Sequence, residues 1–416
     1  MAVAGSSAVR AEVSDADFEE LRQQLAALSQ RLEQLAAENA ELREAQRSPS
    51  TAEGAAREPT VPVAAASWSD RIGMDGDFRY RYETIDAEGS DTRRRNRIRA
   101  RANIKADVSD DIQVGFGLAT GGDDPVSTNQ TLGGGGSSKG VVLNLAYVDW
   151  EATDGLNLIA GKYKNPLLKV GGQPLMWDGD WTPEGLALKY NGDWFFVNAI
   201  GSYLESDSKK SNDSFSWGGQ FGASTTVGDV KLTGGLGYYS IKTAGETTTF
   251  GDPTDPGDFF GNTAVEPGGL PCGTTPGTEC VYLYDYLLTQ VFAEAAFRIG
   301  DWPMSVFADY VRNSDASEND TGWTLGTKIG QAKDRGQWQF TYYFADKEAD
   351  STLGLLTDSD FGGGGTDSRG HWMQVNYGVS KSWKIGAQYF INETGLASGS
   401  KSDYDRLMID MQWKWK

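Results

Sequence analysis

Apolar and polar side chains alternate with a period of two residues along this chain, and that alternation most constrains its fold. In "IGMDGDFRYRYET", residues 72–84, apolar Met74 and Phe78 alternate with charged Asp77 and Arg79. Successive side chains of a strand point to opposite faces, so this stretch has one apolar and one charged face. A soluble sandwich would bury the apolar face, whereas a membrane barrel would turn it to lipid and line its lumen with the charged face.

Sixteen segments share this pattern, and the sequence predicts that each forms a strand. They are 72–85, 94–108, 112–120, 141–152, 156–164, 185–191, 194–205, 214–227, 230–243, 281–299, 303–313, 321–332, 337–347, 370–380, 383–393 and 404–415. Short turns alternate with long connections, of which the longest are 121–140, 165–184, 244–280 and 348–369. Tight turns on one rim and long loops on the other are typical of an outer-membrane barrel. The predicted fold is all-β and transmembrane: a 16-stranded antiparallel up-and-down outer-membrane β-barrel, preceded by a short α-helical coiled coil.

Composition favours the membrane barrel over the sandwich. The chain holds 52 Gly, 13 Trp, 17 Tyr and 17 Phe, a usage that suits aromatic strands joined by glycine-rich turns. Mean hydropathy is −0.47, and no apolar run approaches the roughly 18 residues that a membrane helix needs. Aromatic residues gather in "WQFTYYF" (338–344) and at Trp413 and Trp415, where interfacial belts would lie.

A basic stretch, "RRRNRIRARANIKADVS" (93–109), stands out in a chain of net charge −20 and pI near 4.5. That overall charge repels nucleic acid, so the stretch has a local role. Its alanines and isoleucines share one parity and Arg95, Arg97, Arg99 and Arg101 share the other, which directs these four arginines into the lumen. The predicted pore-lining basic residues are Arg79, Arg81, Arg95, Arg97, Arg99, Arg101, Lys105, Lys162 and Lys164.

The long segment 165–184 carries the acidic residues Asp178, Asp180 and Glu184 beside an apolar run, Leu175 to Trp177. If this segment folds into the lumen, it buries the apolar run and sets its carboxylates across the channel from the arginines, as a constriction loop. A transverse field and a size limit would follow. The alternative is an extracellular loop with solvated acids. Arginines at the wall favour anions and the net charge opposes them, so no ion preference is predicted.

The N-terminal region divides into three predicted parts. Residues 1–13 are the remainder of a secretory signal, with a cleavage pattern at Val9-Arg10-Ala11, or an ordinary disordered terminus. Residues 14–46 form a periplasmic coiled-coil helix, with a lone amphipathic helix as the alternative; its seam is Phe18, Leu21, Leu25, Leu28, Leu32, Leu35, Asn39 and Leu42. Residues 47–67 are a linker rich in Pro, Ala, Ser and Thr, and 68–416 form the barrel domain.

Few residues point to enzymatic or metal chemistry. Cys272 and Cys280, close together in a Gly/Pro-rich segment, predict a loop disulfide rather than a metal site. The single histidine, His371, has no obvious serine–aspartate partnership, so neither a hydrolase nor a metal site is predicted. The glycine runs at 133–136 and 362–365 lack the Lys-Ser/Thr that follows a phosphate-binding loop. We expect no cofactor.

Several stretches in order resemble the putative porins of Gram-negative bacteria: "GDFRYRYE", "DDPVSTNQTL", "LAYVDW", "GLNLIAGKYKNPL" and "DGDWTPEGLAL", together with the N-terminal coiled coil. The likeness covers about residues 18 to 416. It implies a sixteen-stranded trimeric porin with a passive transport role, with pore-lining arginines and with Asp178 and Asp180 on the constriction loop. Such barrels commonly end on an aromatic residue, whereas this chain has Lys416 after Trp415.

The function predicted from these features is passive diffusion of small hydrophilic solutes and ions through an outer-membrane channel of a Gram-negative bacterium. The alternative is a structural anchor that tethers the envelope through its periplasmic coiled coil. A barrel of sixteen strands is too wide to be filled by its own wall side chains, which favours the channel. Expected partners are outer-membrane lipid and lipopolysaccharide, two further copies in a homotrimer, the solutes, and the cell wall through the coiled coil; nucleic acid is not expected. A seam of leucines also permits a dimer, which is the alternative assembly.

Overall fold

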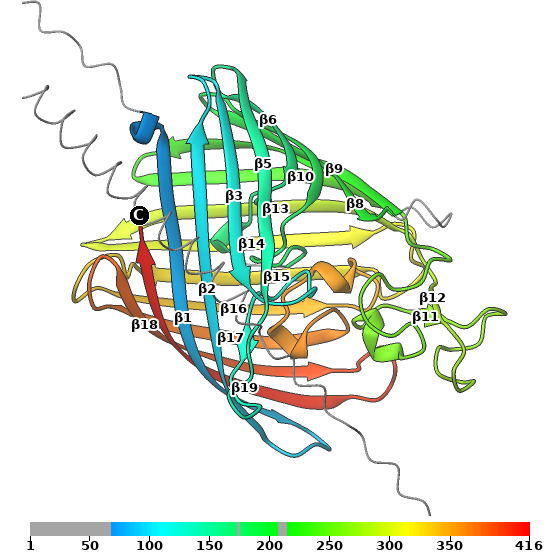
Figure 1. The fold of residues 1–416 in the computed structure, drawn as a ribbon. Helices are drawn as coiled ribbons and strands as arrows, with labels where there is room; N and C mark the ends of the chain where they lie inside the picture. Colours follow the sequence, from blue (N-terminus) through cyan, green and yellow to red (C-terminus); the bar gives the residue numbers. More distant parts are fainter. Residues whose placement is uncertain (1–67, 173–174, 207–213) are drawn as a thin grey trace, which may run out of the picture. The chain divides into compact units, whose positions relative to one another are not determined.

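One closed antiparallel sheet forms the barrel in this computed structural model, which describes residues 68–172, 175–206 and 214–416. The sheet has 17 strands, of which the two-residue β4 (Gln130–Thr131) is an addition within a loop. The other sixteen strands follow one another around the barrel in chain order (Figure 1). The predicted 16-stranded up-and-down barrel is therefore confirmed.

The bounds of the barrel strands lie close to the predicted ones. They are β1 (Ile72–Ala87), β2 (Arg93–Asp107), β3 (Ile112–Thr120), β5 (Val141–Thr153), β6 (Leu156–Lys162), β7 (Glu184–Asn191), β8 (Phe195–Glu205), β9 (Ser214–Val227), β10 (Val230–Ile241), β13 (Tyr286–Ile299), β14 (Trp302–Asn313), β15 (Thr321–Gly330), β16 (Trp338–Lys347), β17 (Ser368–Gly378), β18 (Trp383–Thr394) and β19 (Ser402–Trp415). Each pairs antiparallel with its neighbours.

The first and last strands close the barrel. β1 pairs with β19 over a register that runs from Gly76 opposite Trp415 to Ala87 opposite Tyr404. β1 also pairs with β2, so neither end of the sheet is left as an open edge. This closure brings residues of β1 beside residues of β19 that lie more than 300 positions away in the sequence, a juxtaposition on which the lumen depends.

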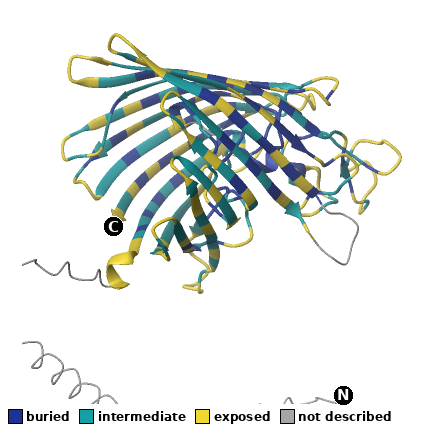
Figure 2. Ribbon diagram, turned by 90° about the horizontal axis from the view of Figure 1, so that it is seen from above, coloured by how far each residue is buried: buried dark blue, intermediate teal, exposed yellow. Residues whose placement is uncertain are grey.

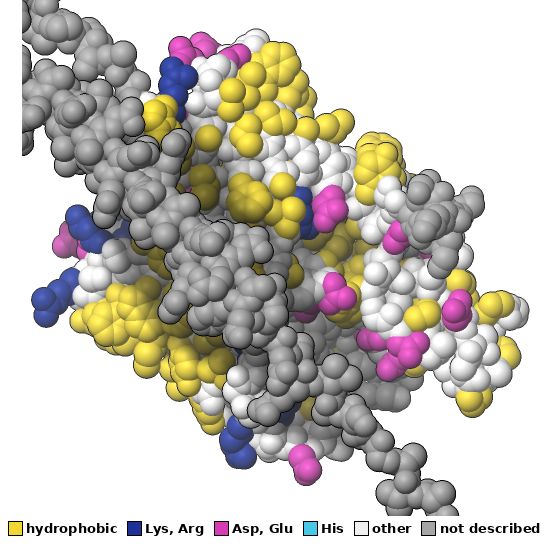
Figure 3. Space-filling model, viewed as in Figure 1, with side chains coloured by type: hydrophobic (Ala, Val, Ile, Leu, Met, Phe, Trp, Pro, Cys, Tyr) yellow, Lys and Arg dark blue, Asp and Glu magenta, His cyan; other side chains and the backbone are white. Residues whose placement is uncertain are grey.

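Burial alternates along the strands, as the period of two predicts. In β14 the burial of side chains alternates strictly from Ser305 to Asn313, and Figure 2 shows the same banding along neighbouring strands. Large apolar side chains on the outward face are exposed, among them Leu236, Val291 and Leu325. Figure 3 shows patches of hydrophobic side chains on the part of the barrel surface that is visible in that view. An exposed apolar band around a closed sheet is the surface that lipid covers.

The two rims of the barrel differ in their connections. Short turns lie on the rim where β1 begins; Gly228, with a φ of 61°, occupies the left-handed conformation that the tight turn between β9 and β10 requires. The opposite rim carries the long connections 121–140, 163–183, 242–285 and 348–367. We call these the turn rim and the loop rim.

Short elements stiffen the loop rim. β4 pairs with β2, and β11 (Ala264–Val265) pairs with β12 (Val281–Tyr282) within the 242–285 loop. Cys272 and Cys280 form a disulfide in the same loop, as the sequence predicted. The helical elements are single 3₁₀ turns: η1 (Trp68–Arg71), η2 (Val170–Gly172), η3 (Pro256–Phe259), η4 (Gly354–Leu356) and η5 (Phe361–Gly363). No helix in the described ranges is long and apolar enough to cross a membrane.

Two predicted strands differ from the structure at one of their ends. The predicted strand 281–299 is wrong at its start, because Asp285 leaves the ladder and accepts hydrogen bonds from the backbone N–H groups of Thr243 and Ala244, both at 2.9 Å. The predicted strand 156–164 ends at Lys162. The predicted coiled coil at 14–46, the N-terminal segment 1–13 and the linker 47–67 all lie outside the described residues.

The exposed apolar band predicts a depth-dependent cost for charge on the outer face. We expect Leu236→Arg, at the middle of β10, to destabilise the barrel in lipid vesicles by about 2–4 kcal/mol. The matched control is Leu232→Arg, on the same face of β10 but near the turn rim, where the cost falls to about 0–1 kcal/mol. Urea unfolding monitored by tryptophan fluorescence measures both, and equal effects of the two substitutions would contradict the lipid-facing assignment.

Candidate functional site

Two loops from the loop rim fold into the lumen. One joins β6 to β7 and comprises residues 163–183, of which 173 and 174 are not described; we call it the β6–β7 loop. The other joins β16 to β17, comprises residues 348–367 and contains η4 and η5; we call it the β16–β17 loop. Both run inside the strands in Figure 1, and most of their large apolar side chains are buried. The inward folding expected of 165–184 is thus present, with a second inserted loop beside it.

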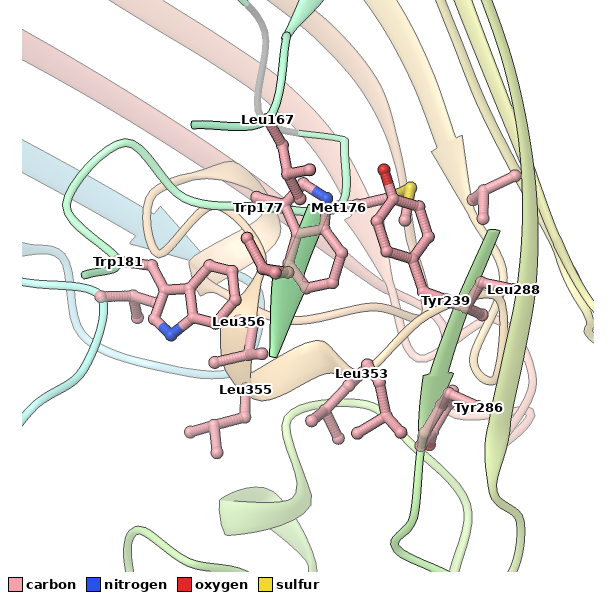
Figure 4. Packing of buried hydrophobic residues seen from close by; sticks show 14 of the residues in the cluster. Leu167, Met176, Trp177, Trp181, Tyr239, Tyr286, Leu288, Leu353, Leu355 and Leu356 are labelled. Atoms are coloured by element: carbon pink, nitrogen blue, oxygen red, sulfur yellow. The ribbon is translucent and has the colours of Figure 1, made fainter. Parts of the chain in front are cut away.

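An apolar core fixes the β6–β7 loop against one side of the barrel. Trp177 stacks on Trp181 with ring centroids 4.9 Å apart and meets the edge of Tyr239, from β10, at 5.2 Å. Figure 4 shows these rings together with Leu355 and Leu356 of the β16–β17 loop. Burial of aromatic side chains contributes strongly to stability, so this cluster holds the loop in place without relying on charge. One side of the lumen is filled by this core.

Polar contacts with the wall fix the tip of the β6–β7 loop. Gln220 of β9 forms two hydrogen bonds with the backbone of Leu168: its Oε1 accepts from the N–H at 2.7 Å and its Nε2 donates to the carbonyl at 3.0 Å. Further on, the Gly171 N–H donates to Glu294 at 3.1 Å and the Gly171 carbonyl accepts from Lys328 at 2.8 Å. A Cβ at Gly171 would overlap the ring of Phe307, so this approach needs glycine.

The two inserted loops are joined to each other at Asp178. Its backbone N–H donates to the Leu356 carbonyl at 2.8 Å, and its Oδ2 accepts from the Ser359 N–H at 3.1 Å. Burial and the nearby carboxylate of Asp358 hold the pKa of Asp178 well above its ordinary value. Asp178 therefore contributes to the contact between the loops, and it also lines a cavity together with Arg79 and Arg99.

The arginines predicted to line the pore do lie together on the lumen face of β1 and β2. Asp77 of β1 lies between two of them, with its carboxylate 3.1 Å from Arg99 and 2.7 Å from Arg101. From the β6–β7 loop, Asp180 approaches the same pair, at 3.3 Å from Arg99 and 2.9 Å from Arg101. The predicted opposition of arginine and acid across open water is wrong here, because the loop brings Asp180 into direct contact with the wall.

A second group of ion pairs lies nearer the loop rim. Arg81 binds Asp410 of β19 at 2.7 Å and Asp360 of the β16–β17 loop at 3.1 Å. Arg406 of β19 binds Asp360 at 2.8 Å and Glu83 at 2.5 Å. Arg95 also pairs with Glu83, and Arg97 lies 3.8 Å from it. This network depends on the pairing of β1 with β19, because its members come from the first strands of the sheet, from its last strand and from an inserted loop.

The remaining predicted site residues separate into two groups. Lys105 pairs with Asp75 at 3.3 Å, and Lys164 lines the same cavity on the turn-rim side. Lys162 and Glu184 were wrongly assigned to the lumen: they are register partners in β6 and β7, and they share the outward parity of exposed Leu186. Their side chains form an ion pair at 2.6 Å at the end of the strands, where charged groups meet the membrane interface.

Sequence reasoning missed the acids of the β16–β17 loop and the partners on β19. Asp358 and Asp360 belong to "LLTDSDF", an apolar run next to two acids, which is the same pattern that singled out 165–184. That pattern is the signal that could have found them. Nothing in the local sequence pairs Arg406 with Glu83, because their contact spans 323 positions.

The four loop carboxylates are in contrasting electrostatic environments. Burial and then the carboxylate of Asp360 raise the pKa of Asp358. Burial also acts to raise the pKa of Asp180, but Arg99 and Arg101 outweigh it and lower that pKa. Burial is likewise outweighed at Asp360, whose pKa is lowered by Arg406 and Arg81. The four acids therefore form two groups: the lowered pKa values of Asp180 and Asp360 favour the carboxylate, whereas the raised pKa values of Asp178 and Asp358 favour the protonated form.

Three cavities remain beside the arginine wall. One of about 430 Å³ opens toward the loop rim along Arg95 and Arg97. A second, of about 340 Å³, shares Ser359 with the first and is lined by Arg79 and Asp180. The third, of about 510 Å³, shares Asp180 with the second and extends toward the turn rim. Across the described part of the chain, no group of three or more His, Cys, Asp or Glu residues could hold a metal ion.

Comparison with known proteins agrees with this geometry. A family model described as putative porin matches residues 86–253 and 285–415, which is more than half of the chain. The chain belongs to this porin family. No curated protein matches the sequence.

Solved structures resemble the barrel at low sequence identity. OprB of Pseudomonas putida is 13% identical, with 83% of this chain and 95% of that chain covered and a TM-score of 0.56. A loop-deletion mutant of OmpT from Vibrio cholerae is 15% identical, with 83% and 100% covered and a TM-score of 0.48. OmpF of Salmonella typhi, in complex with daunomycin, is 12% identical, with 84% and 99% covered and a TM-score of 0.48. The likeness to OprB shows the fold. Family and fold together support an outer-membrane channel.

The raised pKa values of Asp178 and Asp358 predict that the contact between the inserted loops weakens as pH rises. A carboxyl whose pKa is raised in the folded state holds a proton that the unfolded state releases above 3.8, so its stabilising contribution is lost as pH rises through the folded pKa. We expect amide exchange of 175–181 and 353–360, corrected for intrinsic rates, to accelerate in the wild type as pH rises above the ordinary aspartate pKa of 3.8.

Asp358→Asn should remove most of this pH dependence, because it removes the neighbouring charge and keeps the oxygen that accepts from the Asp360 N–H at 2.9 Å. The control is Asp193→Asn, in an exposed turn between β7 and β8. Unchanged pH dependence in Asp358→Asn would show that the Asp358 carboxyl neither titrates in this range nor raises the pKa of Asp178.

Proposed function

We propose that this porin is a passive diffusion channel for small hydrophilic solutes and ions, and that the two inserted loops set the width of its opening. The observation that carries the proposal is the division of the lumen. The apolar core around Trp177 fills one side, while consecutive cavities follow the arginine wall on the other side. A barrel of sixteen strands would otherwise leave a wide aqueous bore.

The route follows the arginines from one rim to the other. A solute enters along Arg95 and Arg97, passes Ser359, and reaches the narrow section beside the ion pair of Arg99 and Asp180 before the cavity at the turn rim. Both signs of charge border this section, so dipolar solutes are oriented there and neither anions nor cations are strongly excluded. Size and polarity are therefore the main selection criteria of the proposed channel.

The proposed setting is the outer membrane of a Gram-negative bacterium, with lipid and lipopolysaccharide around the barrel and the chain's N-terminal segment in the periplasm. Three copies form the proposed assembly, and the heptad seam from Phe18 to Leu42 supplies one helix per subunit beneath the barrels. The envelope anchor is the rival function. The cavities along the arginine wall favour the channel, since an anchor has no use for them.

Planar-bilayer recording tests the channel. We expect the full chain to give conductance steps of stable size, and we expect Asp180→Asn to keep those steps while shifting the reversal potential in a salt gradient toward anions. The substitution removes one negative charge that contacts Arg99 and Arg101 in the narrow section. Asp193→Asn, outside the lumen, serves as the control and should leave the reversal potential unchanged. Silence from well-folded protein would support the anchor instead.

The assembly is tested by mass measurement in mild detergent. We expect the full chain to have three times the mass of one 45.1 kDa subunit. A chain that lacks residues 1–47 should dissociate more readily on dilution if the heptad seam holds the copies together. A truncated protein that remains equally trimeric would show that the barrel walls, not the helices, determine assembly.

A further inference from the structure

Arg79 is a buried cation without an anionic partner in the described structure. Its side chain is only 8% exposed, and it lines the cavity of about 340 Å³ between the wall and the inserted loops. We propose that this cavity binds a small polyhydroxylated monocarboxylate, with the carboxylate on the Arg79 guanidinium. The site deepens the proposed channel function and rests on it, because a solute in transit would occupy this cavity.

The other buried arginines show what Arg79 lacks. Arg81 and Arg406 are each 2% exposed, and each pairs with two carboxylates. No carboxylate in the described ranges lies within ion-pair distance of Arg79, although it is the register partner of Arg99 and lies next but one to Arg81. Burial of an unpaired charge among like charges is costly, so an incoming anion relieves that cost at this position more than at the other two.

The hydrogen bonds of Arg79 leave part of its guanidinium available. Its Nη2 donates to the amide oxygen of Asn129, from the loop between β3 and β5, while its buried Nε has no partner. A guanidinium is always charged and presents its donors in a planar fork that matches a carboxylate. The Nη1 of Arg79 makes no hydrogen bond with a described residue, so this nitrogen offers a charge-assisted site for one carboxylate in the cavity that Arg79 lines.

The wall opposite the inserted loops provides groups for the rest of such a molecule. Gln374 and Gln388 are register partners on β17 and β18, Gln412 is the register partner of Arg79 on β19, and all three line the cavity. Amide side chains both donate and accept hydrogen bonds, as hydroxyl groups require. Trp372 and Phe390 add apolar surface for the carbon skeleton. A volume of about 340 Å³ lies within the range of roughly 300–1,000 Å³ for small-molecule pockets.

The charges across the cavity favour a monoanion over a multiply charged one. Asp180 and Asp360 border the same space as ionised carboxylates, and their positive charge partners are already engaged. One unpaired guanidinium balances one negative charge. A second charge on the ligand would meet the acids without compensation, which disfavours inorganic phosphate as a dianion.

Titration with sodium gluconate tests the site by two independent readouts. In planar bilayers, gluconate should reduce the current in a saturable manner, and isothermal titration of detergent-solubilised full chain should give the same affinity. Arg79→Gln should weaken gluconate binding about tenfold or more, the effect of losing a charge-assisted hydrogen bond, while conductance steps persist. Arg312→Gln, which removes an exposed arginine on the outer face, is the matched control and should leave gluconate binding unchanged.

Glucose and sodium phosphate complete the comparison. Binding of glucose as tight as that of gluconate, or unchanged gluconate affinity in Arg79→Gln, overturns the proposal; tighter binding of phosphate overturns the assignment of a carboxylate. Arg79→Lys retains the charge without the fork and should bind with intermediate affinity, which keeps the test open if Arg79→Gln does not fold. If the protein conducts but does not bind gluconate, only this site is refuted. If it binds gluconate but does not conduct, the proposed channel is refuted and the site stands.

Discussion

Charges that alternation places on the inward face of a closed barrel are costly to bury without partners, and this constraint shapes the lumen. β1 and β2 direct a dense series of arginines inward, where mutual repulsion would oppose closure. Acids from β1 itself, from β19 and from both inserted loops neutralise them, at Asp77, Asp410, Asp180 and Asp360. The arginine wall and the inserted loops therefore stabilise each other. The arginines bind the loops inside the lumen, and the acids of the loops reduce the repulsion among the arginines.

Two kinds of interaction hold the inserted loops in place. On one side, the apolar cluster of Trp177, Trp181 and Tyr239 excludes water and is insensitive to salt. On the other side, ion pairs at Asp180 and Asp360 border a cavity open to solvent, where screening weakens them. A loop held only by ion pairs would move with ionic strength, and one held only by apolar packing would fill the bore. The combination leaves an opening on the charged side.

The strands were predictable from sequence because their cause is local. Alternation over ten or so residues, as in β14, fixes both the strand and its two faces, and the inward direction of Arg99 and Arg101 follows from parity alone. The contacts of the site were not predictable, because they depend on closure and on loop paths. Glu83 meets Arg406 across 323 positions, and no local pattern encodes that meeting. Lys162 was misassigned although it shares the parity of Leu158 and Ala160, which should have directed it outward.

The inserted acids show how environment assigns different roles to one residue type. At the junction of the two loops, burial and then the carboxylate of Asp358 raise the pKa of Asp178. Burial and then the carboxylate of Asp360 raise the pKa of Asp358. Asp180 and Asp360 lie two positions further along each loop, where arginines lower both pKa values. The same spacing in both loops thus places an acid with a raised pKa at the junction and an acid with a lowered pKa beside the arginines. Because a neutral carboxyl can be buried at far lower cost than a carboxylate, this division lets the loops pack together while the opening keeps its charge.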